Sequence, residues 1–521
     1  MTHFQFKVFR GVGDTCMILP GTVYFVGAGP GDPGLVTLRG VSVIQKADVI
    51  LYDYLVNPRL LSYAQPDTKC ICLGRHGRQS LWAPEEIQSR LIKEATAGRS
   101  VVRLKSGDPM IFGRAAAELA AVAAADVPFE VVPGVTAGLA AAAYAGIAVT
   151  NRDIASAVAL VTGQENPDKL DSQLDFSALA QFPGTLVIYM GVTTAKRWTE
   201  QLISHGMDPG RPVTLVRRCG WPDQGVINCR LDEVVDRVIP YRKFPPPVVA
   251  VVGAVTQTTW SWFDRRPLWG QTVIVTRPIH QAESLVSRLE ELGAHVILQP
   301  AVEILDPPTW REVDQVLENL DSYDDLVFTS VNGVGRFMRR LMSNQQWDVR
   351  RLGKMRLSAV GPATVAALAA YHLRSDMQPV EDYRAESVLA MLKPNAAGRR
   401  FLVVRGERGR DVVAPGLRAV DAYVDEVVAY VSRDVTELKE SVIEQLHERR
   451  IDWVMVTSAA IGEAAVRLFA GHCDGAQWVA ISPRTAKALQ KGGVQVVSTA
   501  KQATVDAMID AMLAHVEMRD H

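Results

Sequence analysis

The chain has 521 residues, more than one hydrophobic core usually organises, so two or more domains are expected. Its 56 basic and 57 acidic residues almost cancel, so the overall charge gives no indication that the chain binds nucleic acid or anionic membranes, and any anion-binding site must be local. The six cysteines include no C-x-x-C pair, so we predict no metal site and favour a reducing, cytoplasmic compartment. No segment is apolar enough for a signal peptide or a membrane span, and residues 1–20 are interpreted as a leader, expected to be disordered.

Short β-branched runs alternate with stretches rich in Ala, Leu and Glu that have the helical period. This alternation predicts an α/β protein with largely parallel sheets. The predicted strands include residues 23–26, 49–52, 101–104, 186–189 and 248–252.

The boundary between two units is predicted from chain breakers. The prolines at 245–247 precede the apolar run 248–252, which reads as a last strand of the first unit, so they mark an internal loop. A new strand begins after Gly270, behind the polar and aromatic segment 262–269. We therefore expect a first unit over 21–264 and a second over 265–521.

The second unit contains an internal repeat. Residues 270–277 recur as 398–405, residues 294–296 as 422–424, and residues 324–330 as 452–458, each 128 positions further on. After a gap, residues 359–364 are echoed by 480–485. The repeat predicts two similar α/β lobes with a cleft between them.

Four loops of the first unit each follow a predicted strand. The first, Gly27-Ala-Gly-Pro-Gly-Asp32, departs from the dinucleotide fingerprint because its sixth position is Asp32 and Pro30 removes a backbone donor. The second, Arg103 to Arg114, carries Asp108, which can accept hydrogen bonds from ribose hydroxyls. The others are residues 132–137 and 188–191. Each alone could be a structural turn, but loops at strand ends are where open α/β sheets bind ligands.

These loops, in this order, resemble those of the tetrapyrrole methylase family, and most closely its uroporphyrinogen III C-methyltransferase branch, over residues 21–258. The resemblance implies a two-domain, dimeric methyltransferase that holds S-adenosylmethionine between its domains. It places the cofactor at Pro30, Ser106, Gly107, Asp108, Ile111, Thr136, Ala137 and Met190, with Cys219, Gly220, Gly253 and Ala254 completing the pocket.

The same resemblance assigns catalytic and substrate-binding positions. Asp53 matches the family's proton acceptor, although an Asp at a strand end can equally be a helix cap. Arg75 stands where the family has a lysine proton donor, so either Arg75 only orients substrate carboxylates or no such donor is needed. Arg114 and Arg152 fall on positions that face the tetrapyrrole, or are solvated surface residues. The helix after Arg114 has Ala117 and Glu118 where the family has two glutamates, so one acidic contact is missing.

Residues 270–517 resemble uroporphyrinogen III synthase, through the segments 275–278, 328–332, 360–364, 405–410, 428–430, 456–458 and 481–485. The resemblance implies two lobes joined by crossing strands, one over about 270–304 plus 431–517 and the other over 305–430. It also implies cyclisation of hydroxymethylbilane without a metal or an organic cofactor.

In this second unit, Tyr430 is the candidate general acid, unless it is a structural phenol. Hydroxyls and neighbouring backbone N–H groups are expected to bind the substrate's propionates at Thr329, Ser330, Thr364, Thr457, Ser458 and Thr485. The alternative is that these residues only cap helices.

Together the two resemblances predict a homodimeric enzyme of small-molecule tetrapyrroles. Hydroxymethylbilane would become uroporphyrinogen III and then, with two S-adenosylmethionine, precorrin-2, the branch point toward sirohaem and cobalamin. Two alternatives remain. The first unit could methylate another tetrapyrrole or a diphthamide precursor, against which Arg114 and Arg152 argue, and the second could be an idle substrate-binding or regulatory module.

Overall fold

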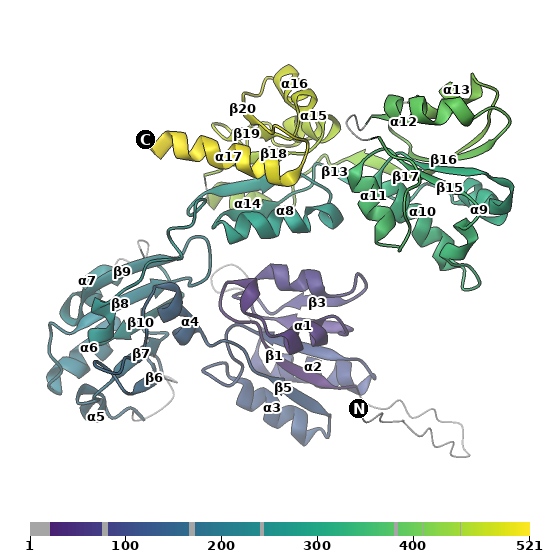
Figure 1. Cartoon of the computed structure of the whole chain (residues 1–521). Helices are drawn as coiled ribbons and strands as arrows, with labels where there is room; N and C mark the ends of the chain where they lie inside the picture. Colours follow the sequence, from purple (N-terminus) through teal and green to yellow (C-terminus); the bar gives the residue numbers. More distant parts are fainter. Residues whose placement is uncertain are drawn as a thin grey trace, which may run out of the picture. The chain divides into compact units, whose positions relative to one another are not determined.

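A computed structural model of the chain describes residues 21–74, 82–165, 172–239, 244–379, 384–409, 411–448 and 450–520 (Figure 1). The chain divides into two compact units, with unit 1 ending at Gly270 and unit 2 beginning at Gln271. The proposed leader and Arg75 lie outside the described residues. Among the residues that are described, no helix is long and apolar enough to cross a membrane.

The first sheet of unit 1 is parallel, in the order β3-β2-β4-β1-β5. Helices cover both of its faces, α1 (Leu38–Ile44) on one and α2 (Pro84–Thr96) with α3 (Ala115–Ala124) on the other. Burial on both sides is why its central strands read as nearly continuous apolar runs. The strands are β1 (Val23–Gly27), β2 (Val49–Tyr52), β3 (Lys69–Cys72), β4 (Val101–Lys105) and β5 (Phe129–Val132).

The second sheet of unit 1 is mixed, in the order β6-β7-β10-β8-β9. Strands β6 and β7 are parallel, but β10 runs antiparallel to β7 and β8, and β8 runs antiparallel to β9. The expectation of largely parallel sheets is therefore wrong here, because β10 inserts between two strands of the opposite direction. The strands are β6 (Val158–Thr162), β7 (Thr185–Tyr189), β8 (Pro212–Arg217), β9 (Gly225–Arg230) and β10 (Val248–Val252). Helix α4 (Ala137–Tyr144) packs on this sheet through its alanines.

Unit 2 also contains two sheets, which confirms the predicted α/β class for the whole chain. One is parallel, in the order β12-β11-β18-β19-β20, with β11 (Thr272–Val275), β12 (His295–Leu298), β18 (Trp453–Val456), β19 (Gln477–Ala480) and β20 (Val496–Thr499). The other has the order β13-β17-β16-β14-β15, with β13 (Val302–Leu305), β14 (Asp325–Phe328), β15 (Arg356–Ala359), β16 (Arg400–Gly406) and β17 (Tyr423–Asp434).

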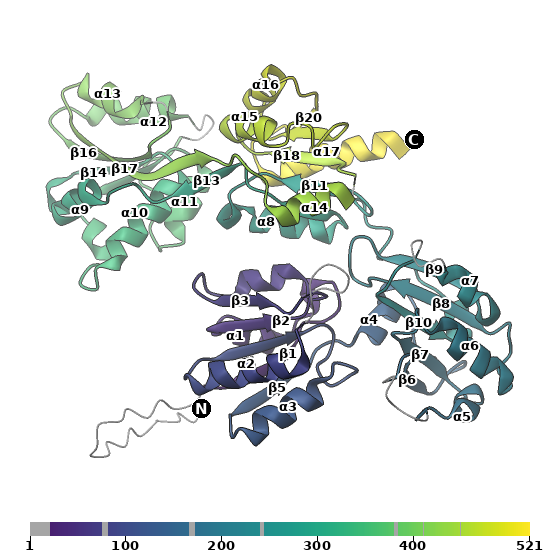
Figure 2. The ribbon, with the colours of Figure 1, turned by 180° about the vertical axis from the view of Figure 1, so that it is seen from behind.

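The internal repeat occupies equivalent places in these two sheets. In the repeat, β11 and β12 correspond to β16 and β17, and β14 and β15 correspond to β18 and β19. The order β12-β11-β18-β19 in one sheet thus matches β17-β16-β14-β15 in the other. Each sheet combines the first half of one copy with the second half of the other copy. The chain makes this exchange along β13 and the long β17, which pair antiparallel (Figure 2).

Candidate functional site

Three loops meet at the carboxyl ends of three strands of the first sheet. They follow β1, β4 and β5, which are neighbours in that sheet. The first two loops are joined by Gly29 and Gly107, whose backbones exchange hydrogen bonds of 3.2 and 3.0 Å. The third is so close that a Cβ on Gly27 would lie 2.5 Å from the backbone nitrogen of Gly134. A side chain at Gly27 or Gly134 would push these loops apart, and the φ values of 70° at Gly29 and 71° at Gly107 favour glycine there.

Asp108 fastens the second loop to the third. One of its carboxylate oxygens accepts a 2.9 Å hydrogen bond from the backbone of Gly134, and the other accepts one of 2.7 Å from Met110. Each oxygen has a further lone pair and could still accept a hydrogen bond from a ribose hydroxyl. That bond remains a prediction. What the structure adds is that Asp108 also holds the loops together.

Strand β7 of the second sheet ends against the same loops. The phenol of Tyr189 lies 2.8 Å from the hydroxyl of Thr136 and accepts a 2.8 Å hydrogen bond from the backbone of Gly138. The next residue, Met190, has a φ of 53°, which turns the chain at the end of the strand and leaves the side chain 46% exposed. The structure therefore brings the predicted residues Thr136, Ala137 and Met190 together around Tyr189.

Several large apolar side chains around Tyr189 are exposed, and we call this group of side chains the apolar rim. The ring of Phe112 lies with its centroid 4.9 Å from that of Tyr189. The other members are each within two residues of Phe112 or of a residue that contacts Tyr189. Exposed apolar groups in one place are typical of a binding surface for a ligand with a nonpolar face. The rim consists of Met110, Ile111, Phe112, Val135, Leu139 and Met190.

The loop after β8 packs on the loop after β1. Gly220 has a φ of 75°, and a Cβ there would lie 2.8 Å from the carbonyl oxygen of Pro30. Buried Cys219 precedes it, with its thiol 3.8 Å from the backbone oxygen of Ala137. Burial raises the pKa of the Cys219 thiol to about 12, so the thiol stays protonated at neutral pH. Pro30, Ala137, Cys219 and Gly220 thus belong to one cluster.

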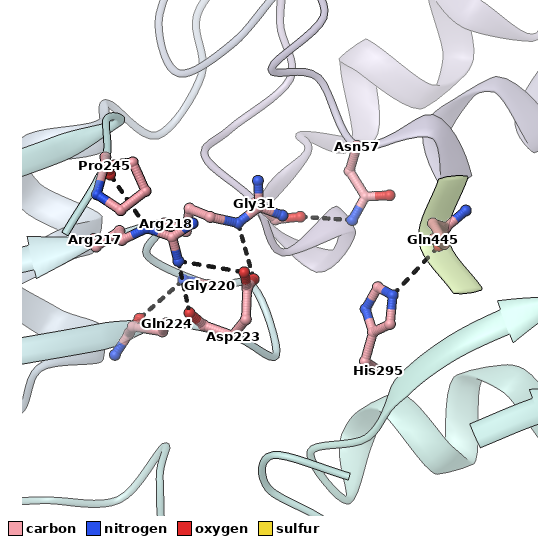
Figure 3. A network of polar contacts seen from close by, with 10 residues as sticks. All are labelled: Gly31, Asn57, Arg217, Arg218, Gly220, Asp223, Gln224, Pro245, His295 and Gln445. Atoms are coloured by element: carbon pink, nitrogen blue, oxygen red, sulfur yellow. Dashed lines mark hydrogen bonds and ion pairs between the residues drawn. The ribbon is translucent and has the colours of Figure 1, made fainter. Parts of the chain in front are cut away.

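Polar side chains stabilise the loop after β8 and the loop after β1, on which it packs (Figure 3). Asp223 accepts hydrogen bonds from Arg218 at 2.9 Å and Arg217 at 3.3 Å, and Gln224 accepts one of 3.0 Å from the backbone of Gly220. On the other side, the amide nitrogen of Asn57 donates a 2.7 Å hydrogen bond to the backbone oxygen of Gly31. The loop after β1 is therefore held from two directions.

Gly253 and Ala254 do not lie with the other predicted cofactor residues. They follow Val252, the last residue of β10, which pairs with the beginning of β7 at Leu186. Met190 follows the opposite end of β7. Because β10 is antiparallel to β7, the segment after β10 is placed at the far end of the sheet, and the prediction for these two residues is wrong.

Asp53 is joined to a buried cluster of charges. Its carboxylate accepts a 2.6 Å hydrogen bond from Arg103 of β4, and its side chain is 32% exposed. Arg103 also donates to Glu118 of α3 at 2.9 Å, and Glu118 accepts from Lys105 at 2.8 Å. The alternation of the strand directs Arg103 and Lys105 to the face that α3 covers. Two cations and two anions balance within this cluster.

The buried charges influence one another's ionisation. Burial alone lowers the pKa of Arg103, but the carboxylates of Asp53 and Glu118 outweigh it and raise that pKa above its usual value. Burial and the neighbouring Arg103 lower the pKa of Lys105. Sequence reasoning missed Arg103 and Lys105. The available signal was two basic residues, two positions apart, in an otherwise apolar central strand.

The two predicted substrate arginines differ in placement. Arg114 is the N-cap residue of α3 and has a φ of 55°, two residues after Phe112 of the apolar rim. Its exposed side chain makes no ion pair with any residue that the structure describes. Arg152 is 93% exposed and lies 3.8 Å from Asp153. Arg114 is therefore beside the loops, whereas no hydrogen bond or ion pair with a described residue connects Arg152 to them.

In unit 2, the predicted hydroxyl residues lie at helix N-termini after parallel strands. Ser330 caps α10 (Val331–Ser343) and Ser458 caps α15 (Ala459–Leu468), each through a hydrogen bond to a backbone nitrogen three residues on. Thr329 and Thr457, partly exposed, precede these caps, and Thr329 donates to the backbone oxygen of Val404 at 3.2 Å. The capping role is thus observed, and it leaves the neighbouring N–H groups free to face a ligand.

Thr364 and Thr485 are buried within the first turns of α11 (Pro362–Ala369) and α16 (Pro483–Lys491). The hydroxyl of Thr485 lies 3.0 Å from that of Ser482. These side chains are therefore less suited to direct substrate contact than the sequence suggested.

Tyr430 lies on a glycine of the neighbouring strand. It pairs with Gly406 across β17 and β16, and a Cβ on Gly406 would lie 2.5 Å from the Cζ atom of Tyr430. Tyr430 is 9% exposed, and its hydroxyl makes no hydrogen bond with the described part of the chain. The phenol is therefore held in place, and its proton has no acceptor among the described residues.

Comparisons with known proteins match the two units to two different families. Residues 22–235 match the family model of tetrapyrrole (corrin/porphyrin) methylases, and residues 283–510 match that of uroporphyrinogen-III synthase HemD. The porphyrin biosynthesis protein HemD of Ruminiclostridium josui is 30% identical over 496 residues, which cover 95% of this chain and 98% of that protein.

Two further relatives cover less of the chain. The uroporphyrinogen-III C-methyltransferase of Bacillus subtilis (strain 168) is 37% identical over 337 residues, 64% of this chain and 68% of that protein. The siroheme synthase of Zymomonas mobilis is 44% identical over 248 residues, 47% of this chain and about half (52%) of that protein. The chain belongs to the tetrapyrrole methylase family through its first unit and to the uroporphyrinogen-III synthase family through its second, as a fusion of the two.

Proposed function

We propose that the chain carries out two consecutive reactions of tetrapyrrole biosynthesis. Unit 2 cyclises hydroxymethylbilane to uroporphyrinogen III, and unit 1 transfers two methyl groups from S-adenosylmethionine to that product, yielding precorrin-2. The observation that carries the proposal is the presence of both families in one chain, because the product of one reaction is the substrate of the other. The names of the Bacillus and Zymomonas relatives favour this methyl transfer and the sirohaem branch.

The loops of unit 1 fit S-adenosylmethionine. Gly27 and Gly134 allow the loop backbones to pack directly on one another, which gathers the loops at the strand ends where open α/β sheets bind ligands. The apolar rim suits its adenine or the face of the substrate macrocycle. When bound, this cofactor supplies an electrophilic methyl group. The cluster of Pro30, Asp108, Thr136 and Met190 is the part of the chain that we propose to hold it.

Asp53 is the proposed proton acceptor after carbon methylation. Its partly exposed carboxylate lies at the carboxyl end of β2, and its backbone nitrogen bonds to Leu104, immediately before the loop that carries Asp108. The ion pair with Arg103 holds the carboxylate in one orientation. Arg114 is proposed to bind a substrate carboxylate, and Arg152 another on the more exposed side.

In unit 2, we propose that Tyr430 donates a hydrogen bond to the hydroxyl group that leaves hydroxymethylbilane. The resulting cation is captured by the pyrrole ring at the other end of the linear tetrapyrrole. The enzyme's main task is therefore to hold this substrate in a bent conformation. The N-termini of α10 and α15 attract the propionates through backbone N–H groups. The chain is further proposed to act in the cytoplasm and as a homodimer.

The alternative is that unit 2 only binds tetrapyrroles. A test uses the full chain with hydroxymethylbilane and without S-adenosylmethionine, followed by chromatographic separation of uroporphyrinogen isomers. Enzymatic cyclisation yields the type III isomer, whereas the spontaneous reaction yields type I. Supplying uroporphyrinogen III with S-adenosylmethionine tests unit 1 separately. Type I alone, with methyl transfer intact, would establish the idle-module alternative.

A further inference from the structure

The internal repeat places an arginine at the end of the equivalent strand in each sheet of unit 2. Arg277 follows β11, and its counterpart 128 positions on is Arg405, next to the end of β16. Both are therefore at the carboxyl end of a parallel strand, where loops of α/β sheets bind ligands. The surroundings of the two arginines differ, and the difference indicates a separate role for Arg277.

Arg405 is neutralised by protein groups. Its guanidinium lies 3.2 Å from a carboxylate oxygen of Glu426 and 3.8 Å from one of Asp411. It also donates a hydrogen bond of 3.2 Å to the backbone oxygen of Gly406. The positive charge of Arg405 is thus used within the fold.

Arg277 makes no ion pair with any carboxylate in the described ranges. Its polar contact is a long one, 3.5 Å from a terminal nitrogen to the amide oxygen of Gln281. Its Nε atom is buried and lacks a hydrogen-bond partner among the described residues. Burial lowers the pKa of Arg277, which reflects the cost of holding a charge away from water. A half-buried guanidinium without an anion is unfavourable in the protein alone.

Arg277 lies where two loops of the proposed site meet. Gln281, its contact, donates a 2.6 Å hydrogen bond to the side chain of Asn332 in the first turn of α10. Ser330 caps that same helix. Arg277 and the N-terminus of α10 therefore act on the same region, and both favour a negative charge there.

We propose that Arg277 binds an acetate or propionate carboxylate of the tetrapyrrole in the synthase reaction. The inference rests on the function proposed for unit 2, and it names the substrate group that Arg277 contacts. A substrate carboxylate would accept hydrogen bonds from the two terminal nitrogens of the guanidinium, in the two-pronged geometry that arginine favours, and would supply the missing negative charge. Arg405, its counterpart in the repeat, has no such role because Glu426 already neutralises it.

The test compares Arg277→Gln with Arg288→Gln in the full chain. Arg288 lies in α8 (Ile279–Glu291), the helix that follows Arg277, but it is exposed and pairs with Glu291. For Arg277→Gln we expect the KM for hydroxymethylbilane to rise about ten- to a hundredfold, the effect of losing charge-assisted hydrogen bonds, with kcat nearly unchanged. Arg288→Gln should leave both constants unchanged. Arg277→Lys, which keeps the charge without the fork, should give an intermediate KM.

A second measurement does not depend on turnover. Hydrogen exchange is followed in the full chain with and without uroporphyrinogen III, in peptides covering 276–285 and 328–336. We expect protection of both peptides in the wild type and its loss in Arg277→Gln. Equal protection in the two proteins, or an unchanged KM, would overturn the role of Arg277. Absence of type III isomer with the wild type, while the protection pattern holds, would instead overturn the synthase activity.

Discussion

The carboxylate of Asp53 accepts a 2.6 Å hydrogen bond from Arg103, which is 2% exposed. Arg103 in turn bonds Glu118, so the partly exposed Asp53 is the outer end of a buried chain of alternating charges. Such a cluster fixes the direction of the carboxylate from beneath, because each member would be costly to bury without its partner. Asp53 is thus oriented by the core of the parallel sheet as well as by its own loop.

Asp53→Asn should slow methyl transfer while leaving cyclisation unchanged. The amide still accepts a hydrogen bond from Arg103 but is a far weaker base. Loss of a general base commonly costs about a hundred- to ten-thousandfold in rate. The measurement is transfer of labelled methyl groups to supplied uroporphyrinogen III, with cyclisation of hydroxymethylbilane as the internal control. Full methyl transfer would reduce Asp53 to a structural role.

Arg103→Leu should destabilise unit 1 strongly, because it leaves Asp53 and buried Glu118 without their shared cation. Breaking a buried pair from one side typically costs about 3–5 kcal/mol. Arg39→Leu is a suitable control, since its pair with Glu130 is exposed and screened by water. Urea unfolding followed by a probe in unit 1 should show a much lower midpoint for Arg103→Leu than for Arg39→Leu. Equal midpoints would mean that the buried cluster is not important for stability.

Asp108→Ala and Asp108→Asn should separate the two roles of this residue. Alanine removes the hydrogen bonds to Gly134 and Met110, so both the loop arrangement and cofactor affinity should suffer. Asparagine keeps one oxygen acceptor but loses the charge, so an intermediate affinity is expected. Isothermal titration with S-adenosylmethionine measures the dissociation constants. Unchanged affinity in the alanine variant would remove Asp108 from the cofactor site.

Much of this architecture could be predicted from local sequence. The strands at 49–52 and 248–252 have the predicted bounds, because β-branched runs between breakers are typical of buried strands. Strand direction could not be predicted, since a buried strand reads alike in either direction. The wrong placement of Gly253 and Ala254 is the direct consequence, because the direction of β10 decides the end of the sheet at which they lie.

The exchange of strands between the two copies could not be predicted from the repeat itself; the expectation of crossing strands came only from the resemblance to uroporphyrinogen III synthase. The repeat shows which segments are alike, such as β11 and β16, but not which copy's strands pair with which. Long-range pairing also decides the environment of Tyr430, which depends on the absence of a side chain at Gly406. Arg103 and Glu118 meet only because α3 folds over β4.

Gly406→Ala should impair cyclisation by displacing Tyr430, since the new methyl group would lie 2.5 Å from the ring. Tyr430→Phe keeps the ring and removes the proposed donor. We expect both variants to lower kcat for formation of the type III isomer, with methyl transfer unaffected. Isomer analysis after timed incubation measures this. A fully active Tyr430→Phe would exclude the phenol as the general acid.

The cysteines should differ in their rates of alkylation. Burial raises the pKa of Cys219 and of Cys473 to about 12, so at pH 8 only about one thiol in ten thousand is ionised. Cys70 and Cys72 are exposed on β3. Peptide mass spectrometry after brief iodoacetamide treatment should find label on Cys70 and Cys72 well before Cys219. Early labelling of Cys219 would contradict its packing against Ala137.

The most direct test of the two-reaction account is incubation of the full chain with hydroxymethylbilane and S-adenosylmethionine labelled in its methyl group. The account predicts a type III macrocycle that carries two labelled methyl groups, identified by mass spectrometry after isomer separation. An unmethylated product, or methylated macrocycles of type I only, would contradict it.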